Sequence, residues 1–255
     1  MIHESAIIDP TAVIGKNVTV GPWTMIGADV VVGDDCNIGP HVVLKGPTIL
    51  GSNNKIYQFS TIGDDTPDLK YKGEPTRLIV GDNNVIREGV TIHRGTVQDN
   101  SETVIGSNNL LMAYVHIGHD CVVGDHVIMI NNSAIAGHVH VGDWSILSGF
   151  SMIHQYVNLG AHCFIGPAAF IYHDVPACVT VSGNPAEPRT INREGLKRRG
   201  FSADDIALIN KAYKILYRRG LKLSEAILTI KNLGVQTVIS AFVESLEKSN
   251  RGIIR

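Results

Sequence analysis

The stretch YVHIGHDC, residues 114–121, places three side chains capable of proton chemistry within five positions. His116 and His119 lie three residues apart, and Asp120 directly follows the second histidine. A histidine can accept and return a proton near neutral pH, and a neighbouring carboxylate raises its pKa and fixes its tautomer. Histidines at this spacing can also hold a metal ion. The elements that carry these residues decide which chemistry is available.

A six-residue repeat organises most of the chain. An aliphatic residue or methionine recurs at every sixth position over residues 8–62, 80–92 and 105–171, and glycine often follows it directly. A period of six fits neither an α-helix nor a long half-buried strand, but it fits short strands joined by tight corners. Three such strands close a triangular coil of about eighteen residues, and stacked coils form a parallel β-helix.

Two segments interrupt the repeat and are expected to protrude from the coils. Residues at about 64–79 and 94–104 carry proline, glycine and charged side chains without the six-residue rhythm. Loops on a rigid solenoid are natural places for substrate contacts.

From about residue 192 the pattern becomes helical. Ser202 is a predicted N-cap, Asp205 follows in the first turn, and apolar residues recur at helical spacing. The predicted helices cover residues 202–220, 224–233 and 235–248. We therefore divide the chain into a β-helix domain over 1–190 and an α-helical domain over 191–255.

The composition limits the classes of function. The 255 residues are 44% hydrophobic and 18% charged, and no segment approaches the roughly 20 apolar residues that span a bilayer. A formal charge of −2 argues against a nucleic-acid footprint over the whole molecule. Because the N-terminal stretch lacks a secretory signal, we expect a cytoplasmic protein without an integral membrane segment. In that reducing compartment four cysteines are predicted to be small buried hydrophobes: Cys36, Cys121, Cys163 and Cys178.

Coil stacking predicts which distant residues meet. Adding eighteen to His119 gives Gly137 and then Gln155, and adding eighteen to Asp120 gives His138. The resulting patch holds a base, a carboxylate and a glycine N–H that can face a developing oxyanion, which are the parts needed for acyl transfer. Adjacent residues on a straight strand point to opposite faces, so contact between His119 and Asp120 requires a corner or another bond.

Several longer segments resemble one family. Together with YVHIGHDC, they closely resemble UDP-N-acetylglucosamine acyltransferases, which catalyse the first step of lipid A biosynthesis: IYQF (56–59), DLKYKGEPTR (68–77), TIHRGTVQ (91–98), NREGLKRRGF (192–201) and RGIIR (251–255). The resemblance implies a left-handed parallel β-helix with a C-terminal α-helical domain, assembled as a homotrimer with active sites between subunits. It also implies transfer of a 3-hydroxyacyl chain from the phosphopantetheine of acyl carrier protein to the 3-hydroxyl of UDP-N-acetylglucosamine, with no cofactor and no metal.

The resemblance assigns roles to individual positions. It implies that His119 is the general base, that Asp120 orients it, and that Gly137 supplies an N–H to the oxyanion. It marks further substrate-binding positions: Asp68, Lys70, His93, His116, His138, His154, Gln155, Asn192, Glu194, Arg198 and Arg199.

The stretch GAHCFIGPAAF, residues 160–170, matches the part of the family that lies along the acyl chain. Pro167 occupies the position where relatives that carry glycine leave room for a longer chain. Because proline adds volume and restricts the backbone, we expect a preference for a shorter acyl chain than that of a glycine-bearing relative.

Three alternatives remain open at this point. Hexapeptide β-helices include gamma-type carbonic anhydrases, which hold zinc with three histidines across a subunit interface, and His116, His119 and His138 are candidates for such a site. The acceptor can also be a 3-amino nucleotide sugar. A scaffold without catalytic activity is the third alternative, and intact folding without nucleotide-sugar binding would favour it.

Overall fold

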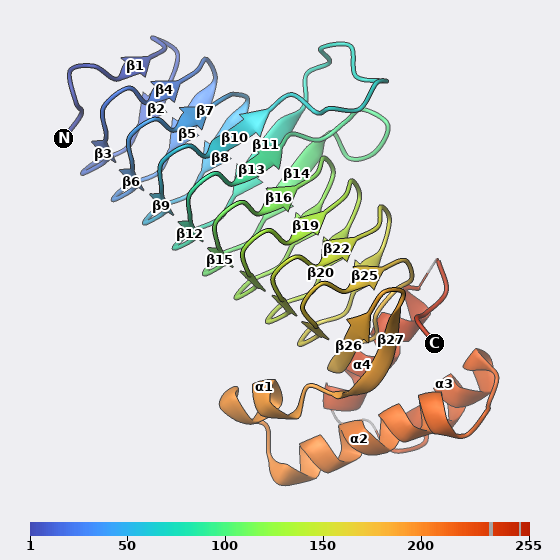
Figure 1. Cartoon of the computed structure of the whole chain (residues 1–255). Coiled ribbons are helices and arrows are strands. Elements are labelled where there is room, and N and C mark those ends of the chain that lie inside the picture. The colour runs from blue at the N-terminus through green and yellow to red at the C-terminus, as the bar shows by residue number, and fades with distance from the viewer. Residues whose placement is uncertain (235–236, 250) are drawn as a thin grey trace.

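The computed structural model describes residues 1–234, 237–249 and 251–255. Three-sided coils stack along one axis to form a long parallel β-helix, and the C-terminal helices lie at its far end (Figure 1). Each coil contributes one short strand to each of three sheets, here named A, B and C.

The strands of each sheet follow in stacking order. Sheet B contains β1 (Ile7–Ile8), β4 (Met25–Ile26), β7 (Val43–Leu44), β10 (Thr61–Asp64), β13 (Thr91–His93), β16 (His116–Ile117), β19 (Ala134–Ile135), β22 (Met152–Ile153) and β25 (Phe170–Ile171). Sheet C contains β2 (Val13–Ile14), β5 (Val30–Val32), β8 (Thr48–Leu50), β11 (Arg77–Val80), β14 (Glu102–Ile105), β17 (Val122–Val123), β20 (His140–Val141) and β23 (Asn158–Leu159). Sheet A contains β3 (Thr19–Val20), β6 (Asn37–Ile38), β9 (Lys55–Ile56), β12 (Val85–Ile86), β15 (Leu110–Leu111), β18 (Ile128–Met129), β21 (Ile146–Leu147), β24 (Phe164–Ile165), β26 (Val179–Gly183) and β27 (Ala186–Ile191).

The pairing register confirms the predicted coil length. Ile117 pairs with Ile135, and Ile135 pairs with Ile153, each eighteen residues further along the chain. From β3 onward, the second residue of each two-residue strand is buried, and Ile117 and Ile135 have no exposed surface. Ile8 and Ile14 in the first coil are half-buried. The repeated aliphatic positions therefore form the continuous core, held by apolar burial along the whole axis.

The two interruptions emerge at the same corner of the coils. Residues 65–76 connect β10 to β11, and residues 94–101 connect β13 to β14, so both leave from the corner between sheets B and C. Figure 1 shows them projecting on one side of the β-helix. Each loop ends earlier than predicted, because Arg77 and Glu102 already pair as strand residues and form an ion pair of 2.7 Å.

An antiparallel hairpin that the repeat did not predict follows the last coil. Strand β26 adds to sheet A beside β24, and β27 runs back along it. After it come α1 (Arg193–Arg198), α2 (Ala203–Arg218), α3 (Leu223–Lys231) and α4 (Thr237–Glu247). Ser202 caps α2 through a capping box with Asp205, which confirms that prediction. The predicted start of the last helix, at residues 235–236, lies outside the described residues.

The C-terminal tail packs back onto the last coil. Asp174, only 1% exposed, accepts hydrogen bonds from the Asn158 N–H at 2.7 Å and the Ser249 hydroxyl at 2.7 Å. Ile253 and Ile254 are buried beside it. Among the described residues, no helix is both long and apolar enough to cross a membrane.

Candidate active site

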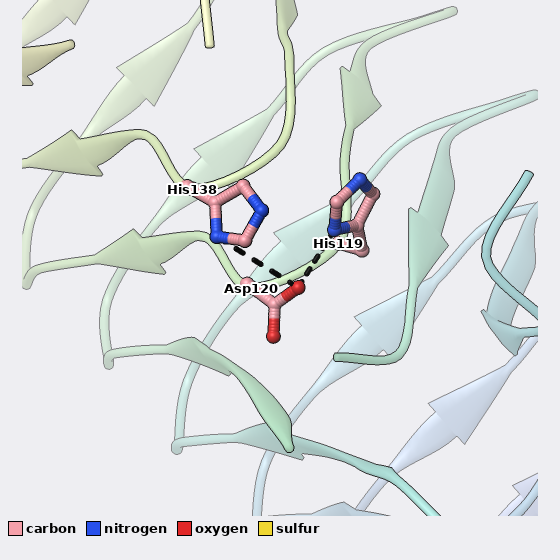
Figure 2. Close-up of side chains that lie close together, drawn as sticks. All are labelled: His119, Asp120 and His138. Carbon is pink, nitrogen blue, oxygen red and sulfur yellow. Dashed lines mark hydrogen bonds and ion pairs between the residues drawn. The ribbon is translucent and has the colours of Figure 1, made fainter. Parts of the chain in front are cut away.

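His119 and Asp120 occupy the corner between sheets B and C, directly after β16. Asp120 has a φ of +57°, and this left-handed turn allows two adjacent side chains to face each other. The Nδ1–H of His119 donates to Oδ2 of Asp120 at 2.7 Å (Figure 2). The corner thus provides the direct contact that the sequence left open.

Asp120 is fixed by the second protruding loop. Its carboxylate accepts hydrogen bonds from the N–H of Thr96 at 2.8 Å and from the Thr96 hydroxyl at 2.7 Å. Its own N–H donates to the Thr103 hydroxyl at 2.8 Å. Burial opposes ionisation of Asp120, but the hydrogen bonds from His119 and Thr96 outweigh it and lower the pKa of this carboxyl below its ordinary value.

The ionised Asp120 fixes the tautomer of His119. Because the carboxylate holds the proton on Nδ1, Nε2 keeps a free lone pair that can accept a proton. The His119 side chain is 14% exposed, so this lone pair remains accessible, and Nε2 lies 4.0 Å from Oδ2 of Asp68 in the first loop. His119 therefore has the geometry of a general base.

Gly137 lies against the imidazole of His119, as the stacking arithmetic predicted. A Cβ at position 137 would lie 2.6 Å from both Cε1 and Nε2 of His119. The N–H of Gly137 donates to no acceptor within the described residues. A donor of this kind beside the base is suited to an oxyanion.

His138 lies beside the pair and is tied to the second loop. Its Nδ1–H donates to Oδ2 of Asp99 at 2.7 Å, and its ring stacks on Tyr156 with centroids 4.3 Å apart. Its ring packs nearly perpendicular to the ring of His119, with centroids 4.9 Å apart. Figure 2 shows both histidines pointing toward the carboxylate of Asp120.

His93 and His116 lie on neighbouring coils of sheet B, with ring centroids 5.4 Å apart. Nδ1 of His116 forms a hydrogen bond of 2.8 Å with the Thr91 hydroxyl, and Nδ1–H of His93 donates to the carbonyl of Asp65 at 2.7 Å. Burial, with smaller contributions from His93 and His119, lowers the pKa of His116, so this ring is neutral near neutral pH.

The remaining predicted residues of this corner are more exposed. Gln155 lies one coil beyond Gly137, and its carbonyl accepts a hydrogen bond of 3.0 Å from the guanidinium of Arg251. His154 is half-buried, and the side chain of Lys70 is exposed on the first loop.

Arg94 anchors the first loop, and the sequence reasoning missed it. Its guanidinium is buried, donates to the carbonyls of Gly46 at 2.9 Å and Gly63 at 2.7 Å, and forms an ion pair with Asp65. It also donates to the Tyr71 hydroxyl at 3.0 Å. The sequence reasoning missed Thr96 and Asp99 as well. The one signal that could have identified them is that both loops interrupt the six-residue repeat shortly before the His119 corner.

A second group of predicted residues lies elsewhere on the chain. A groove of about 450 Å³ on sheet A is lined by Asn192, Glu194, Arg198 and Arg199 together with aliphatic side chains of that sheet. The Arg199 guanidinium lies 5.5 Å from the centre of the Trp144 ring.

Arg199 also fixes the protonation state of a half-buried histidine in this region. Its Nη1 donates to Nδ1 of His162 at 3.2 Å. Burial, followed by the charge of Arg199, lowers the pKa of His162 to about 4, so this ring is a neutral acceptor. Asn192 caps α1 and donates to the carbonyl of His162 at 3.0 Å, which fixes the start of the helix that carries Arg198.

One chain does not bring the two groups together. His119 lies at the corner between sheets B and C, whereas Trp144, on the second group's groove, lies at the corner between sheets C and A. Pro167 is exposed at the third corner, between sheets A and B. The predicted residues thus lie at three separate places on one chain: the His119 corner, the groove on sheet A, and the corner that carries Pro167.

The group of residues with the geometry to hold a metal ion differs from the candidate zinc triad of His116, His119 and His138. Within the described residues, one group of three has ligand atoms within 4.8 Å of one another: His119, Asp120 and His138. Asp120 takes the place that the sequence reasoning gave to His116, whose Nδ1 is occupied by Thr91.

Comparisons with known proteins agree along the whole length. A family model described as UDP N-acetylglucosamine O-acyltransferase, domain 2, matches residues 174–254, and the bacterial transferase hexapeptide model matches residues 11–46, 29–64 and 102–129. The chain is 58% identical over 256 residues to the acyl-[acyl-carrier-protein]–UDP-N-acetylglucosamine O-acyltransferase of Stutzerimonas stutzeri, covering 100% of this chain and 99% of that protein.

Solved structures extend the agreement to the fold. The UDP-N-acetylglucosamine O-acyltransferase of Moraxella catarrhalis is 43% identical, with a TM-score of 0.98 and coverage of 100% of this chain and 99% of that one. The UDP-N-acetylglucosamine acyltransferase of Francisella novicida is 41% identical, with a TM-score of 0.98 and coverage of 100% and 94%. The predicted left-handed parallel β-helix with C-terminal helices is confirmed, and the chain belongs to the UDP-N-acetylglucosamine O-acyltransferase family.

Proposed function

We propose that this chain transfers a 3-hydroxyacyl group from acyl carrier protein to the 3-hydroxyl of UDP-N-acetylglucosamine, the first step of lipid A biosynthesis. The observation that carries the proposal is the His119–Asp120 pair, with a free Nε2 above Gly137, in a chain that is 58% identical to relatives named for this reaction. The four unpaired cysteines fit a reducing compartment, so we place the reaction in the cytoplasm.

The proposed step is a direct attack on the thioester. Nε2 of His119 takes the proton of the sugar hydroxyl, and the oxygen forms a bond to the thioester carbonyl carbon. The N–H of Gly137 stabilises the negative oxygen of the tetrahedral intermediate. The carbon–sulfur bond then breaks, and His119 returns the proton to the departing phosphopantetheine thiolate. Asp120 stabilises the imidazolium while it carries that proton.

A cysteine nucleophile does not fit this site. Cys121 follows the catalytic pair directly, but it is fully buried, and burial raises the pKa of its thiol to about 12. The reactive form of cysteine is the thiolate, which is scarce at neutral pH when the pKa is so high. We therefore propose that no acyl-enzyme forms.

The surrounding polar groups supply substrate contacts in this proposal. The predicted positions at this corner, on the adjoining strands of sheet B and on the first loop are Asp68, Lys70, His93, His116, His138, His154 and Gln155. They offer hydrogen bonds to the sugar and its amide. Arg198 and Arg199 offer bidentate contacts to the pyrophosphate or to the acidic carrier protein, and Asn192 and Glu194 lie beside them on the groove of sheet A.

A homotrimer would join the two groups into one cleft. The base lies at the corner between sheets B and C and the groove lies along sheet A, so a threefold axis parallel to the β-helix can place the His119 corner of one subunit against the groove of the next. Light scattering on the purified protein should give three times the mass of the chain. A monomer that retains full activity would contradict the shared cleft.

The experiment that tests the reaction combines purified protein with UDP-N-acetylglucosamine and a panel of 3-hydroxyacyl carrier proteins. Mass spectrometry should detect the 3-O-acylated nucleotide sugar and released carrier protein. A parallel reaction with the 3-amino nucleotide sugar tests the alternative acceptor, since product formed from that sugar alone would correct the acceptor. Absence of product from both sugars would reject the acyltransferase reaction.

Pro167 is proposed to limit the length of the acyl chain. Pro167 lies in an exposed turn and is followed by Ala168 with a φ of +52°. Its ring therefore adds volume at the point where the polypeptide backbone changes direction. We expect Pro167→Gly to shift the optimum of the same donor panel toward longer chains. An unchanged optimum would reject this role, and thermal unfolding of the variant serves as the control for altered folding.

A further inference from the structure

Three potential metal ligands lie together at this corner, because His119, Asp120 and His138 each offer a ligand atom within 4.8 Å of the others, and Asp99 lies just outside that group beside His138. Oδ2 of Asp120 lies 2.7 Å from Nδ1 of His119 and 3.9 Å from Nδ1 of His138. Oδ2 of Asp99 lies 2.7 Å from the same nitrogen of His138. Figure 2 shows both rings turning this nitrogen toward the Asp120 carboxylate.

These three separations lie on either side of the ligand–ligand distance in a tetrahedral zinc site. Bonds of about 2.0–2.2 Å from zinc to nitrogen or oxygen place tetrahedral ligand atoms about 3.3–3.6 Å apart. The two contacts of 2.7 Å would have to open by less than 1 Å, and the contact of 3.9 Å would have to close slightly. Asp99 lies outside the group of three, so its loop must shift to bring its carboxylate to the ion; its side chain is 34% exposed, which leaves room for that shift and a route for the ion to enter.

We propose that a zinc ion binds to His119, His138, Asp120 and Asp99 and inhibits the enzyme. Two imidazole nitrogens select zinc over the oxygen-preferring ions calcium and magnesium. Two carboxylates balance the charge of the ion, which reduces the cost of placing it beside the buried Asp120.

Inhibition follows from the tautomer of His119, and this part rests on the proposed function. Zinc at Nδ1 displaces the proton that Asp120 holds there, and the neutral ring then carries its proton on Nε2. The atom that must accept the proton of the sugar hydroxyl is thereby blocked. Binding of the ion itself does not depend on the reaction and can be measured without substrate.

Zinc binding should be measured on the intact protein by competition with a chromophoric chelator. We expect one tight site per chain, and cobalt in the same site should show the visible absorption of a tetrahedral complex. Asp99→Asn should weaken zinc binding at least about tenfold, because it removes one ligand and leaves the buried contacts of Asp120 in place. His138→Gln should weaken it further.

His41→Gln provides the matched control. His41 also occupies a coil corner with positive φ, but it stacks between Trp23 and Phe59 on another edge. Its variant should bind zinc as tightly as the unmodified protein. Zinc affinity that is the same in Asp99→Asn, His138→Gln and the unmodified protein, or no bound zinc at all, would overturn the site.

Turnover measured with increasing zinc separates the two parts of the proposal. We expect activity to fall as the site fills and to return when EDTA removes the ion. Full turnover with zinc bound at the site would contradict the proposed inhibition but not the proposed zinc binding. Failure to acylate any sugar would reject the proposed reaction, and the chelator titration would still decide the binding site.

Discussion

Replacing His119 by alanine should lower kcat by about 10²-fold to 10⁴-fold, because the variant has no group at the position of Nε2 to take the proton of the hydroxyl. The KM values should change less, since the other polar groups of the corner remain. The fold should persist, because the backbone hydrogen bond from the N–H of His138 to the carbonyl of residue 119 does not involve the ring. Steady-state kinetics with a 3-hydroxyacyl carrier protein and UDP-N-acetylglucosamine measure the effect.

His41→Ala is the control for this experiment, because it removes a corner histidine far along the coil stack from the catalytic pair. It should leave kcat unchanged. Near-normal turnover by His119→Ala would contradict the assignment of His119 as the general base. Circular dichroism of both variants shows whether a loss of activity reflects a loss of structure.

Gly137→Ala should lower kcat by about 10²-fold with little loss of stability. The new methyl carbon would lie 2.6 Å from Cε1 and Nε2 of His119, closer than van der Waals contact permits. The ring cannot yield without breaking the hydrogen bond of 2.7 Å to Asp120. The base is then misplaced relative to its substrate, and misplacement of about 1 Å can cost two orders of magnitude in rate.

Gly27→Ala is the matched control for position 137. Its added carbon would lie 3.3 Å from the carbonyl oxygen of Leu44, with no side chain of the site in range. Both glycines have backbones outside the left-handed region, so alanine fits the main chain at each. If Gly137→Ala turns over as fast as Gly27→Ala, the ring is not held where the structure places it.

The β-helix could be predicted because aliphatic residues recur at every sixth position of the sequence. Each coil buries an aliphatic residue on each of its three sides. The spacing of residues such as Ile117 and Ile135 therefore predicts both the buried core and the register of strand pairing. The same arithmetic brought His119 to Gly137 and Asp120 to His138. These contacts depend only on an unbroken count of eighteen.

The loop contacts could not be predicted, because the loops break that count. Thr61 pairs with Thr91 thirty residues on, and Thr91 pairs with His116 twenty-five residues on. No fixed spacing then identifies the partner of a loop residue such as Thr96 or Asp99. The hairpin over 179–191 was missed for a related reason, since it pairs antiparallel and has no six-residue signature.

The corner loops have a consequence for how such a protein can change. Strand pairing resumes in register after each one, so the chain can gain or lose residues at that corner without disturbing the aliphatic core. Stability and substrate choice are therefore carried by separate parts of the sequence. A relative with longer or shorter loops at this corner can therefore acquire a new acceptor substrate while every strand of the β-helix keeps its pairing partners.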